Sequence, residues 1–422
     1  MLFRSPSYCS KITPTWSLSS SLEQRLVCHL DEKDLSCSYT CGTNINSPDV
    51  CRSYRNLHSI LIFDTQARYK PGEDIGNFFS RGIGSGHLLQ LRVLDLEHVF
   101  QPQLPNTIGT LIHLIYLGLR WTYLKTIPSS IGNLKNLQTL DLKHTYICIL
   151  PSSVWKLQKL QHLYMNEIHR CRILNKPRCN FLRNLQTLWG AFEDKDSPLK
   201  DGLYKLISLR KLKMAIQLNL SQQQELAGSL TKMSHLQTLK LKTIDEMGWP
   251  QNLKLYCLSG LENLANLYLF GKLETPSIIN INGLPLNLTE LTLSASRLSN
   301  DPMPELEKLC QLKSLSFYFD SYTGTSMVCS NGGFPQLQIL RFWMLNVLEE
   351  WKVEEQALPK LKNLEIRSCE KLMVPTGLRH LKTLRELKLK DMALEFNAKI
   401  EVTMDQIWGD IAHAPAIIID TK

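Results

Sequence analysis

The stretch that decides the fold is IPSSIGNLKNLQTLDLKHTYICI, from Ile127 to Ile149, together with LPSSVWKLQKLQHLYM, from Leu150 to Met165. The second stretch nearly repeats the first, and its leucines follow those of the first at a constant interval, as Leu160 follows Leu137. A fixed period in this range is typical of stacked structural repeats. We therefore expect the same leucine pattern elsewhere in the chain.

The pattern L-x-x-L-x-L recurs along most of the chain. Thirteen copies begin at Leu91, Leu114, Leu137, Leu160, Leu185, Leu209, Leu236, Leu264, Leu288, Leu312, Leu337, Leu361 and Leu384. Leu57-Ile60-Ile62 is an outlying first copy, separated by a longer insert. All steps between the thirteen copies lie within the 20–29 residues that are typical of leucine-rich repeats.

The residue pattern of each copy has a physical reason. Alternate residues of a strand point to opposite faces, so the two leucines of x-L-x-L-x share one face. A single repeat cannot bury its leucines and must stack on its neighbours. Pro128 and Pro151 follow the strands, where the chain turns back without losing a ladder hydrogen bond. The predicted fold class is therefore α/β: a leucine-rich-repeat solenoid, or horseshoe, of 13 to 14 repeats, with a concave parallel β-sheet and an irregular, short-helical convex side.

This pattern divides the 422 residues into four segments. We expect an irregular or disordered N-terminal segment at 1–50, and a degenerate first repeat with a capping and linking role at 51–90. The leucine-rich-repeat domain then covers 91–408, and 409–422 form a C-terminal tail. The segment 1–22 faintly resembles an organelle transit peptide, but a disordered start or an arbitrary beginning of a longer chain is the preferred interpretation.

The composition excludes several classes of protein. The chain is 43% hydrophobic and 21% charged, as ordinary globular proteins are, and has no run of about 18 apolar residues that would predict a membrane span. Its net charge of +9 is spread among interspersed acids and bases, which does not indicate nucleic-acid binding. The twelve cysteines lack the paired spacing of a zinc site, so we expect free thiols in a reducing compartment.

No motif for catalysis or for a cofactor stands out. The chain has no HExxH helix, no GxSxG elbow and no G-x-x-x-x-G-K-[ST] phosphate loop. Gly82-Ile83-Gly84-Ser85-Gly86 is followed by a repeat strand rather than a helix, so we interpret it as a linker. His144 and His162 lie on neighbouring repeats without a carboxylate or cysteine beside them, which makes a poor metal site. We predict no catalytic, cofactor-binding or metal-binding residues.

Binding on a solenoid usually uses the concave surface, which here consists of the x positions of x-L-x-L-x. Lys211, Lys213, Lys240 and Lys242 come from adjacent repeats, and we expect their ammonium groups to form a patch for an acidic partner or, alternatively, an ordinary solvated strand face. Aromatic side chains and one arginine complete the candidates: Arg120, Trp121, Tyr164, Trp189, Tyr268, Tyr318 and Trp343. These aromatic residues are either interface anchors or packing elements. Trp155 and Trp351 fall outside the pattern, so we expect them to be structural.

From about residue 50 to its end, the chain resembles the repeat region of plant intracellular disease-resistance proteins of the coiled-coil nucleotide-binding class. LRVLDLEHV at Leu91–Val99 resembles that family's first clear repeat, and the next three repeats follow its LPxxIxxLxxLxxLxL cadence. LEEWKVEEQALPKLKNLEIRSCEKL at Leu348–Leu372 resembles its late repeats, and LKTLRELKLKDM and IAHAPAIII resemble its ending.

The resemblance implies a cytoplasmic, non-catalytic protein that recognises a pathogen effector or a guarded host protein in plant defence. It also implies that the early repeats face a nucleotide-binding switch domain, a module that the chain itself lacks. The alternative is a standalone cytoplasmic signalling scaffold of leucine-rich repeats, which more regular steps throughout would favour. The substrate-recognition arm of a ubiquitin ligase would need an adaptor-binding helical domain in front, which residues 1–50 do not resemble.

Overall fold

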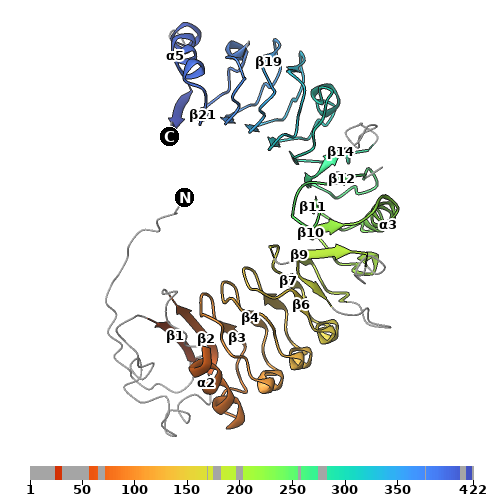
Figure 1. Cartoon of the computed structure of the whole chain (residues 1–422), viewed down its shortest axis with the longest axis vertical. Helices are drawn as coiled ribbons and strands as arrows, with labels where there is room; N and C mark the ends of the chain where they lie inside the picture. Colours follow the sequence, from red (N-terminus) through yellow and green to blue (C-terminus); the bar gives the residue numbers. More distant parts are fainter. Residues whose placement is uncertain are drawn as a thin grey trace.

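The computed structural model describes residues 24–30, 57–64, 72–168, 170–173, 182–195, 203–254, 258–273, 283–375, 377–408 and 415–420. Over these ranges the chain forms an open arc (Figure 1). Strands line the inner side of the arc, while helices and turns cover the outer side.

One parallel sheet of sixteen strands runs along the whole arc. In order, its strands are β1 (Gln24–Leu30), β2 (Leu57–Asp64), β3 (Val93–Asp95), β4 (Tyr116–Gly118), β5 (Thr139–Asp141), β7 (His162–Tyr164), β9 (Thr187–Asp194), β10 (Lys211–Gln217), β11 (Thr238–Thr243), β13 (Asn266–Phe270), β15 (Glu290–Ser294), β16 (Ser314–Tyr318), β18 (Ile339–Trp343), β20 (Asn363–Arg367), β21 (Glu386–Lys390) and β22 (Ala416–Asp420). Spatial order follows chain order, as expected when each repeat stacks on the one before it.

Each of the thirteen predicted copies forms one strand of this sheet, from β3 to β21, and the outlying copy at Leu57 forms β2. The predicted solenoid is therefore confirmed. The sheet extends beyond the predicted repeat domain, because β1 lies in the segment expected to be irregular and β22 lies in the expected tail. The rest of 1–50, including Cys37 and Cys41, lies outside the described residues. The division into four segments stays a prediction.

The leucines of the pattern form the core. In the repeat that starts at Leu137, for example, Leu137, Leu140 and Leu142 are all completely buried. The same holds along the arc, and the buried side chains form one continuous cluster from Leu57 to Ile400. Trp351 is completely buried and Trp155 nearly so, which confirms their predicted structural role.

The outer side carries short elements of several kinds. Its helices are α2 (Gly72–Gly84), α3 (Leu220–Leu230), α4 (Met303–Leu306) and α5 (Leu394–Trp408), and its 3₁₀ turns are η1 (Asn106–Thr110), η2 (Ser129–Asn133), η3 (Ser152–Lys156), η4 (Leu203–Lys205) and η5 (Leu378–His380). Three two-stranded sheets pair β6 (Ile149–Leu150) with β8 (Arg172–Ile173), β12 (Asn252–Leu253) with β14 (Lys272–Leu273), and β17 (Ser326–Cys329) with β19 (Glu350–Val353). Among the described residues, no helix is both long and apolar enough to cross a membrane.

Candidate protein-binding surface

Parallel pairing in register places equivalent residues of successive repeats in rows along the concave face. The middle row reads Asp95, Gly118, Asp141, Tyr164, Trp189, Lys213, Lys240, Tyr268, Thr292, Ser316, Arg341, Glu365 and Lys388. The row beside it includes Lys242, Phe270, Ser294, Tyr318, Trp343, Arg367 and Lys390. Eight of the predicted candidates therefore lie in two adjacent rows. Arg120 and Trp121 follow the end of β4 instead.

At the centre of the arc, Trp189, Lys213, Lys240, Lys242 and Glu167 form what we call the central lysine cluster. The Lys213 ammonium lies 2.6 Å from the Glu167 carboxylate, which also accepts a 2.6 Å hydrogen bond from the Trp189 indole. The ammonium groups of Lys213 and Lys240 lie 4.8 and 5.3 Å from the centre of the Trp189 ring. Such cation–π contacts stabilise an ammonium group most where water is excluded.

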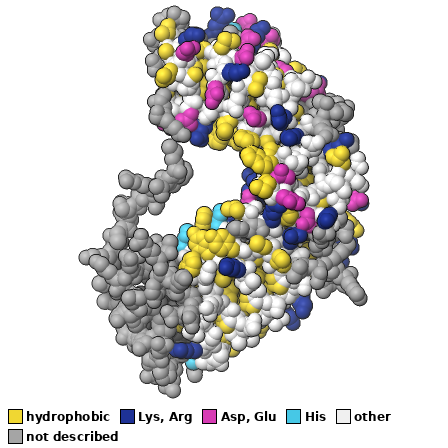
Figure 2. Space-filling model, viewed as in Figure 1, with side chains coloured by type: hydrophobic (Ala, Val, Ile, Leu, Met, Phe, Trp, Pro, Cys, Tyr) yellow, Lys and Arg dark blue, Asp and Glu magenta, His cyan; other side chains and the backbone are white. Residues whose placement is uncertain are grey.

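The charges of this cluster do not cancel. Burial lowers the pKa of Lys242, and the nearby charge of Lys213 lowers it further. Burial and Lys213 likewise lower the pKa of Lys240, although Glu167 opposes the shift. Three ammonium groups thus lie near the Glu167 carboxylate, and the Glu290 carboxylate also acts on Lys240. Figure 2 shows basic and acidic side chains gathered on this part of the hollow.

Two details correct the expected patch of four ammonium groups. Lys213 lies in an ion pair with Glu167, a residue outside the strand pattern, so its charge is largely neutralised. Lys211 is exposed and lies in register with Thr238. It therefore belongs to a different row from Lys213 and Lys240, which lie in register with each other. The remaining uncompensated charge is therefore centred on Lys240 and Lys242.

Near the N-terminal end, Trp121 is the middle of a stacked column. Its ring lies 3.7 Å from the ring of His144, at an angle of 13°, and 5.8 Å from the ring of His98, at 10°. All three residues have left-handed backbone conformations, with φ of 64°, 60° and 56° for His98, Trp121 and His144. Because each repeat makes the same turn at this point, the three side chains leave the backbone in the same direction. Trp121 is 38% exposed, so the column remains accessible at its edge.

A second aromatic column runs beside the first. Phe100 lies 5.6 Å from Tyr123, and Tyr123 lies 5.4 Å from Tyr146, measured between ring centres. Tilted ring pairs at these separations add stabilisation beyond that of the area they bury. Figure 2 shows hydrophobic and histidine side chains gathered on the wall of the hollow near the N-terminal strands.

The other polar candidates at this end are engaged with neighbouring side chains. The Arg120 guanidinium lies 2.6 Å from Glu97 and 3.8 Å from Asp95. The Lys143 ammonium lies 4.1 Å from the centre of the Tyr164 ring. His162 contacts the Thr187 hydroxyl at 3.1 Å, whereas His144 stacks on Trp121. The two histidines noted in the sequence are therefore engaged in different contacts.

Some positions expected to be exposed on the concave face are buried instead. Asp95 occupies the space that a side chain at Gly118 would take, and its burial raises its pKa. Its charge, with that of Asp141, adds to burial in raising the pKa of Tyr116 to about 12. Asn166 donates to the Thr145 carbonyl and is 2% exposed. Gly118, in the middle row, thus leaves space for the buried carboxylate of Asp95.

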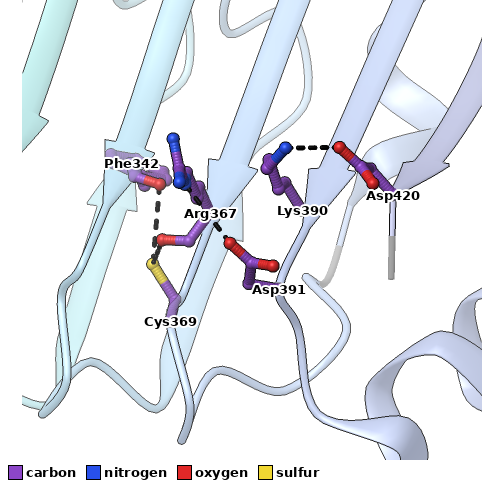
Figure 3. Close-up of polar contacts among 6 residues, drawn as sticks. All are labelled: Phe342, Arg367, Cys369, Lys390, Asp391 and Asp420. Atoms are coloured by element: carbon purple, nitrogen blue, oxygen red, sulfur yellow. Dashed lines mark hydrogen bonds and ion pairs between the residues drawn. The ribbon is translucent and has the colours of Figure 1, made fainter. Parts of the chain in front are cut away.

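At the C-terminal end, the charged side chains of the concave face form ion pairs with carboxylates of neighbouring strands or turns. Arg341 lies 3.4 Å from Glu365. Arg367 lies 3.4 Å from Asp391, and Lys390 pairs with Asp420 of β22, as Figure 3 shows for these two pairs. Below this row, Cys369 donates to the carbonyls of Phe342 and Arg367, and burial raises the pKa of its thiol to about 11.

The aromatic candidates of the central and C-terminal strands pack against neighbouring side chains. Tyr318 stacks on Trp343 at 4.4 Å, and the guanidinium of Arg367 lies 5.7 Å from the Trp343 ring centre. Tyr268 lies 6.0 Å from the Lys240 ammonium, and burial raises its pKa. These contacts support the packing interpretation for Tyr318 and Trp343, whereas Tyr268 borders the central lysine cluster.

Glu167 and most residues of the aromatic columns are not predicted by the strand pattern. His98, Trp121, His144 and Glu167 are separated by equal steps, which match the step between the leucines of the same repeats. Phe100, Tyr123 and Tyr146 follow one another at that step too. The sequence therefore carries a signal at two fixed positions, two and four residues after the last position of each L-x-x-L-x-L pattern. It was overlooked because these positions lie outside the strand.

Comparison with known proteins identifies the family of this chain. The family model described as a leucine-rich repeat region matches residues 85–407. The chain belongs to the leucine-rich repeat region family. Among solved structures, a leucine-rich-repeat protein of Leptospira interrogans is similar with a TM-score of 0.44 and 21% identity, over 86% of this chain and 90% of that one.

Curated relatives of this leucine-rich repeat region include disease resistance proteins of Arabidopsis thaliana. One is 34% identical over 58% of this chain and 25% of that protein, and RPP8 is 33% identical over 56% of this chain and 25% of its own length. An RPP8-like protein is 31% identical over 90% of this chain and 42% of that protein. The resemblance to the repeat region of plant resistance proteins is confirmed. The chain spans less than half the length of each of these relatives.

Proposed function

We propose that this leucine-rich repeat region is a non-catalytic recognition domain that binds a protein partner in the plant defence response, in the cytoplasm. The partner is a pathogen effector, a guarded host protein or a nucleotide-binding switch domain. The relatives support the defence role because they are named disease resistance proteins. The extended concave sheet supports protein binding, because solenoids present long curved surfaces to their partners.

The observation that carries the proposal is the central lysine cluster. Lys213 lies directly across from Lys240, although like charges in opposed positions destabilise a sheet. Glu167 neutralises Lys213, and the Trp189 ring contacts both ammonium groups, but Lys240 and Lys242 have no ion-paired carboxylate among the described residues. An acidic surface of a partner would neutralise the cluster and accelerate association, because complementary charges steer the encounter.

The test is a double charge reversal, Lys213→Glu with Lys240→Glu. The matched control is Lys313→Glu with Lys362→Glu, which changes the net charge equally but outside the cluster. Proximity labelling in leaf cells defines the proteins captured by the wild-type chain, and binding to the purified candidates is then measured. We expect the cluster variant to bind its acidic partner at least about tenfold more weakly, with an unchanged far-UV spectrum. Equal binding by the cluster variant and the control would overturn the proposal.

A further inference from the structure

A pocket of about 370 Å³ opens beside the central lysine cluster. Strands β9, β10, β11 and β13 form its floor, and the turn at 245–248 forms part of its rim. Its lining includes Glu167, Arg170, Phe192, Lys213, Lys242 and Phe270. A concave site with an apolar body and a few convergent polar groups is the usual form of a ligand-binding pocket.

The positive groups of this pocket exceed the carboxylates that neutralise them. Lys213 is paired with Glu167, but Lys242 has no carboxylate within ion-pair distance among the described residues. The Arg170 guanidinium donates to the Gln217 side-chain oxygen at 3.2 Å and to the Asp245 carbonyl at 2.5 Å, and these acceptors are neutral. Two cations of the pocket are therefore left without a carboxylate partner in the part of the chain that the structure describes.

The walls between these cations are apolar. The Arg170 guanidinium lies 5.2 Å from the centre of the Phe192 ring, and Phe270 and Met214 also line the pocket. Met247 on the rim is 82% exposed. Glu246 also lies on the rim and is exposed, so solvent screens its charge from the interior. The pocket thus combines positive charge from Lys242 and Arg170 with apolar contacts from Phe192, Met214 and Phe270.

We propose that this pocket binds an acidic side chain of a partner protein, with the carboxylate beside Lys242 and Arg170 and a neighbouring apolar residue on Phe192 and Phe270. The inference rests on the proposed function and specifies the chemistry of its partner. A carboxylate between these cations makes charge-assisted hydrogen bonds, which are the stronger class of hydrogen bond. Its negative charge also opposes the lowering of the Lys242 pKa, which is caused first by burial and then by the charge of Lys213.

The experiment titrates the intact chain, labelled with ¹³C at lysine ε-carbons, with acetyl-Phe-Asp-Phe-amide and with the uncharged acetyl-Phe-Asn-Phe-amide. The Lys242 resonance is assigned from its loss in Lys242→Met. We expect the aspartate peptide to bind at least about tenfold more tightly and to raise the pKa of Lys242 by about one unit, since one unit corresponds to a tenfold preference. Equal binding of the two peptides, or an unchanged pKa of Lys242 at saturation, would overturn the proposal.

Two variants and a second probe separate the role of the Lys242 charge from that of the peptide backbone. In Lys242→Met the preference for aspartate over asparagine should fall to about one, while Lys313→Met should retain it. The free acid 3-phenylpropionate offers a carboxylate without a peptide backbone. If it binds more tightly than the aspartate peptide, the pocket is a small-molecule site and the assignment to a protein side chain is wrong. Because these measurements need no partner, they fail or succeed separately from the partner-binding test above.

Discussion

The central and C-terminal parts of the concave face are built on the same sheet but carry their charges differently. In the C-terminal part, Arg341 lies across from Glu365, so opposite charges meet on neighbouring strands. Arg367 and Lys390 also lie across from each other there, but each is paired with its own carboxylate, Asp391 or Asp420. In the central part, Lys213 lies across from Lys240, so like charges meet. Cross-strand pairs of opposite charge stabilise a sheet, and pairs of like charge destabilise it.

This difference separates the two roles of a repeat surface. The C-terminal rows have partners within the chain, and nothing external is needed to balance them. The central rows have an excess of positive charge on a scaffold that could carry neutral residues there. This excess of positive charge is the feature on which the proposed binding of an acidic partner rests.

The largest expected effect concerns the backbone of the central part. Gly190 is the extra residue of a bulge in β9, where the register between β9 and β10 shifts. Its φ is 83°, and a Cβ atom there would lie 2.4 Å from the Met165 carbonyl oxygen. Gly190→Ala should therefore lower the free energy of unfolding by about 3 kcal/mol, measured by urea denaturation.

Gly228→Ala is the control for this variant. Gly228 lies in α3, and a Cβ atom there would have open space around it. This change should instead raise the free energy of unfolding by about 0.5–1 kcal/mol, because alanine favours the helix. If Gly190→Ala is as stable as the wild type, the close approach of β9 to the preceding repeat does not constrain the centre of the arc.

An intermediate effect is expected if the C-terminal part is made to resemble the centre. Glu365→Lys replaces the partner of Arg341 and places a third cation between Arg341 and Lys388. Its cost should be about 1 kcal/mol in urea denaturation at low salt, and should shrink in 0.5 M salt because the charges are partly exposed. Glu365→Gln, which removes the pair without adding a like charge, should cost less. A cost that does not depend on salt would contradict the electrostatic explanation.

The smallest effect is a difference in how stability depends on pH. Unfolded lysine holds its proton up to a pKa near 10.5, but Lys242 loses its proton at lower pH in the folded chain. Between these two values the unfolded state binds more protons, so this group makes the free energy of unfolding rise with pH. Lys242→Met should remove that contribution, so its stability should rise less than that of the wild type between pH 8 and about 10.5. Parallel curves for the two chains would show that Lys242 titrates normally.

Much of the fold could be predicted from the leucines, because burial forces them to recur at the same point of every repeat. That single requirement accounts for the thirteen strands from β3 to β21 and for the outlying strand β2. Strands β1 and β22 lack the L-x-x-L-x-L pattern, so their sequences do not predict that they belong to the sheet. They were missed because an end strand has a neighbour on one side alone and need not repeat the pattern.

The candidate surface was less predictable, because it depends on contacts between loops rather than on a repeated hydrophobic requirement. The positions of Lys213 and Lys240 in adjacent rows followed from the period, but the neutralisation of Lys213 depends on Glu167, which lies after β7. Likewise, the stacking of Trp121 between His98 and His144 depends on a left-handed backbone at all three positions. Residue spacing reveals which side chains are neighbours, whereas the local backbone decides which of them touch.

The parallel sheet has a mechanical consequence. Its hydrogen bonds run along the length of the arc, from each strand to the next, so tension between the two ends acts along the bonds. Under such a load the ladders separate one after another instead of sharing the force. The chain should therefore extend in steps, with one repeat detaching from its neighbour at a time.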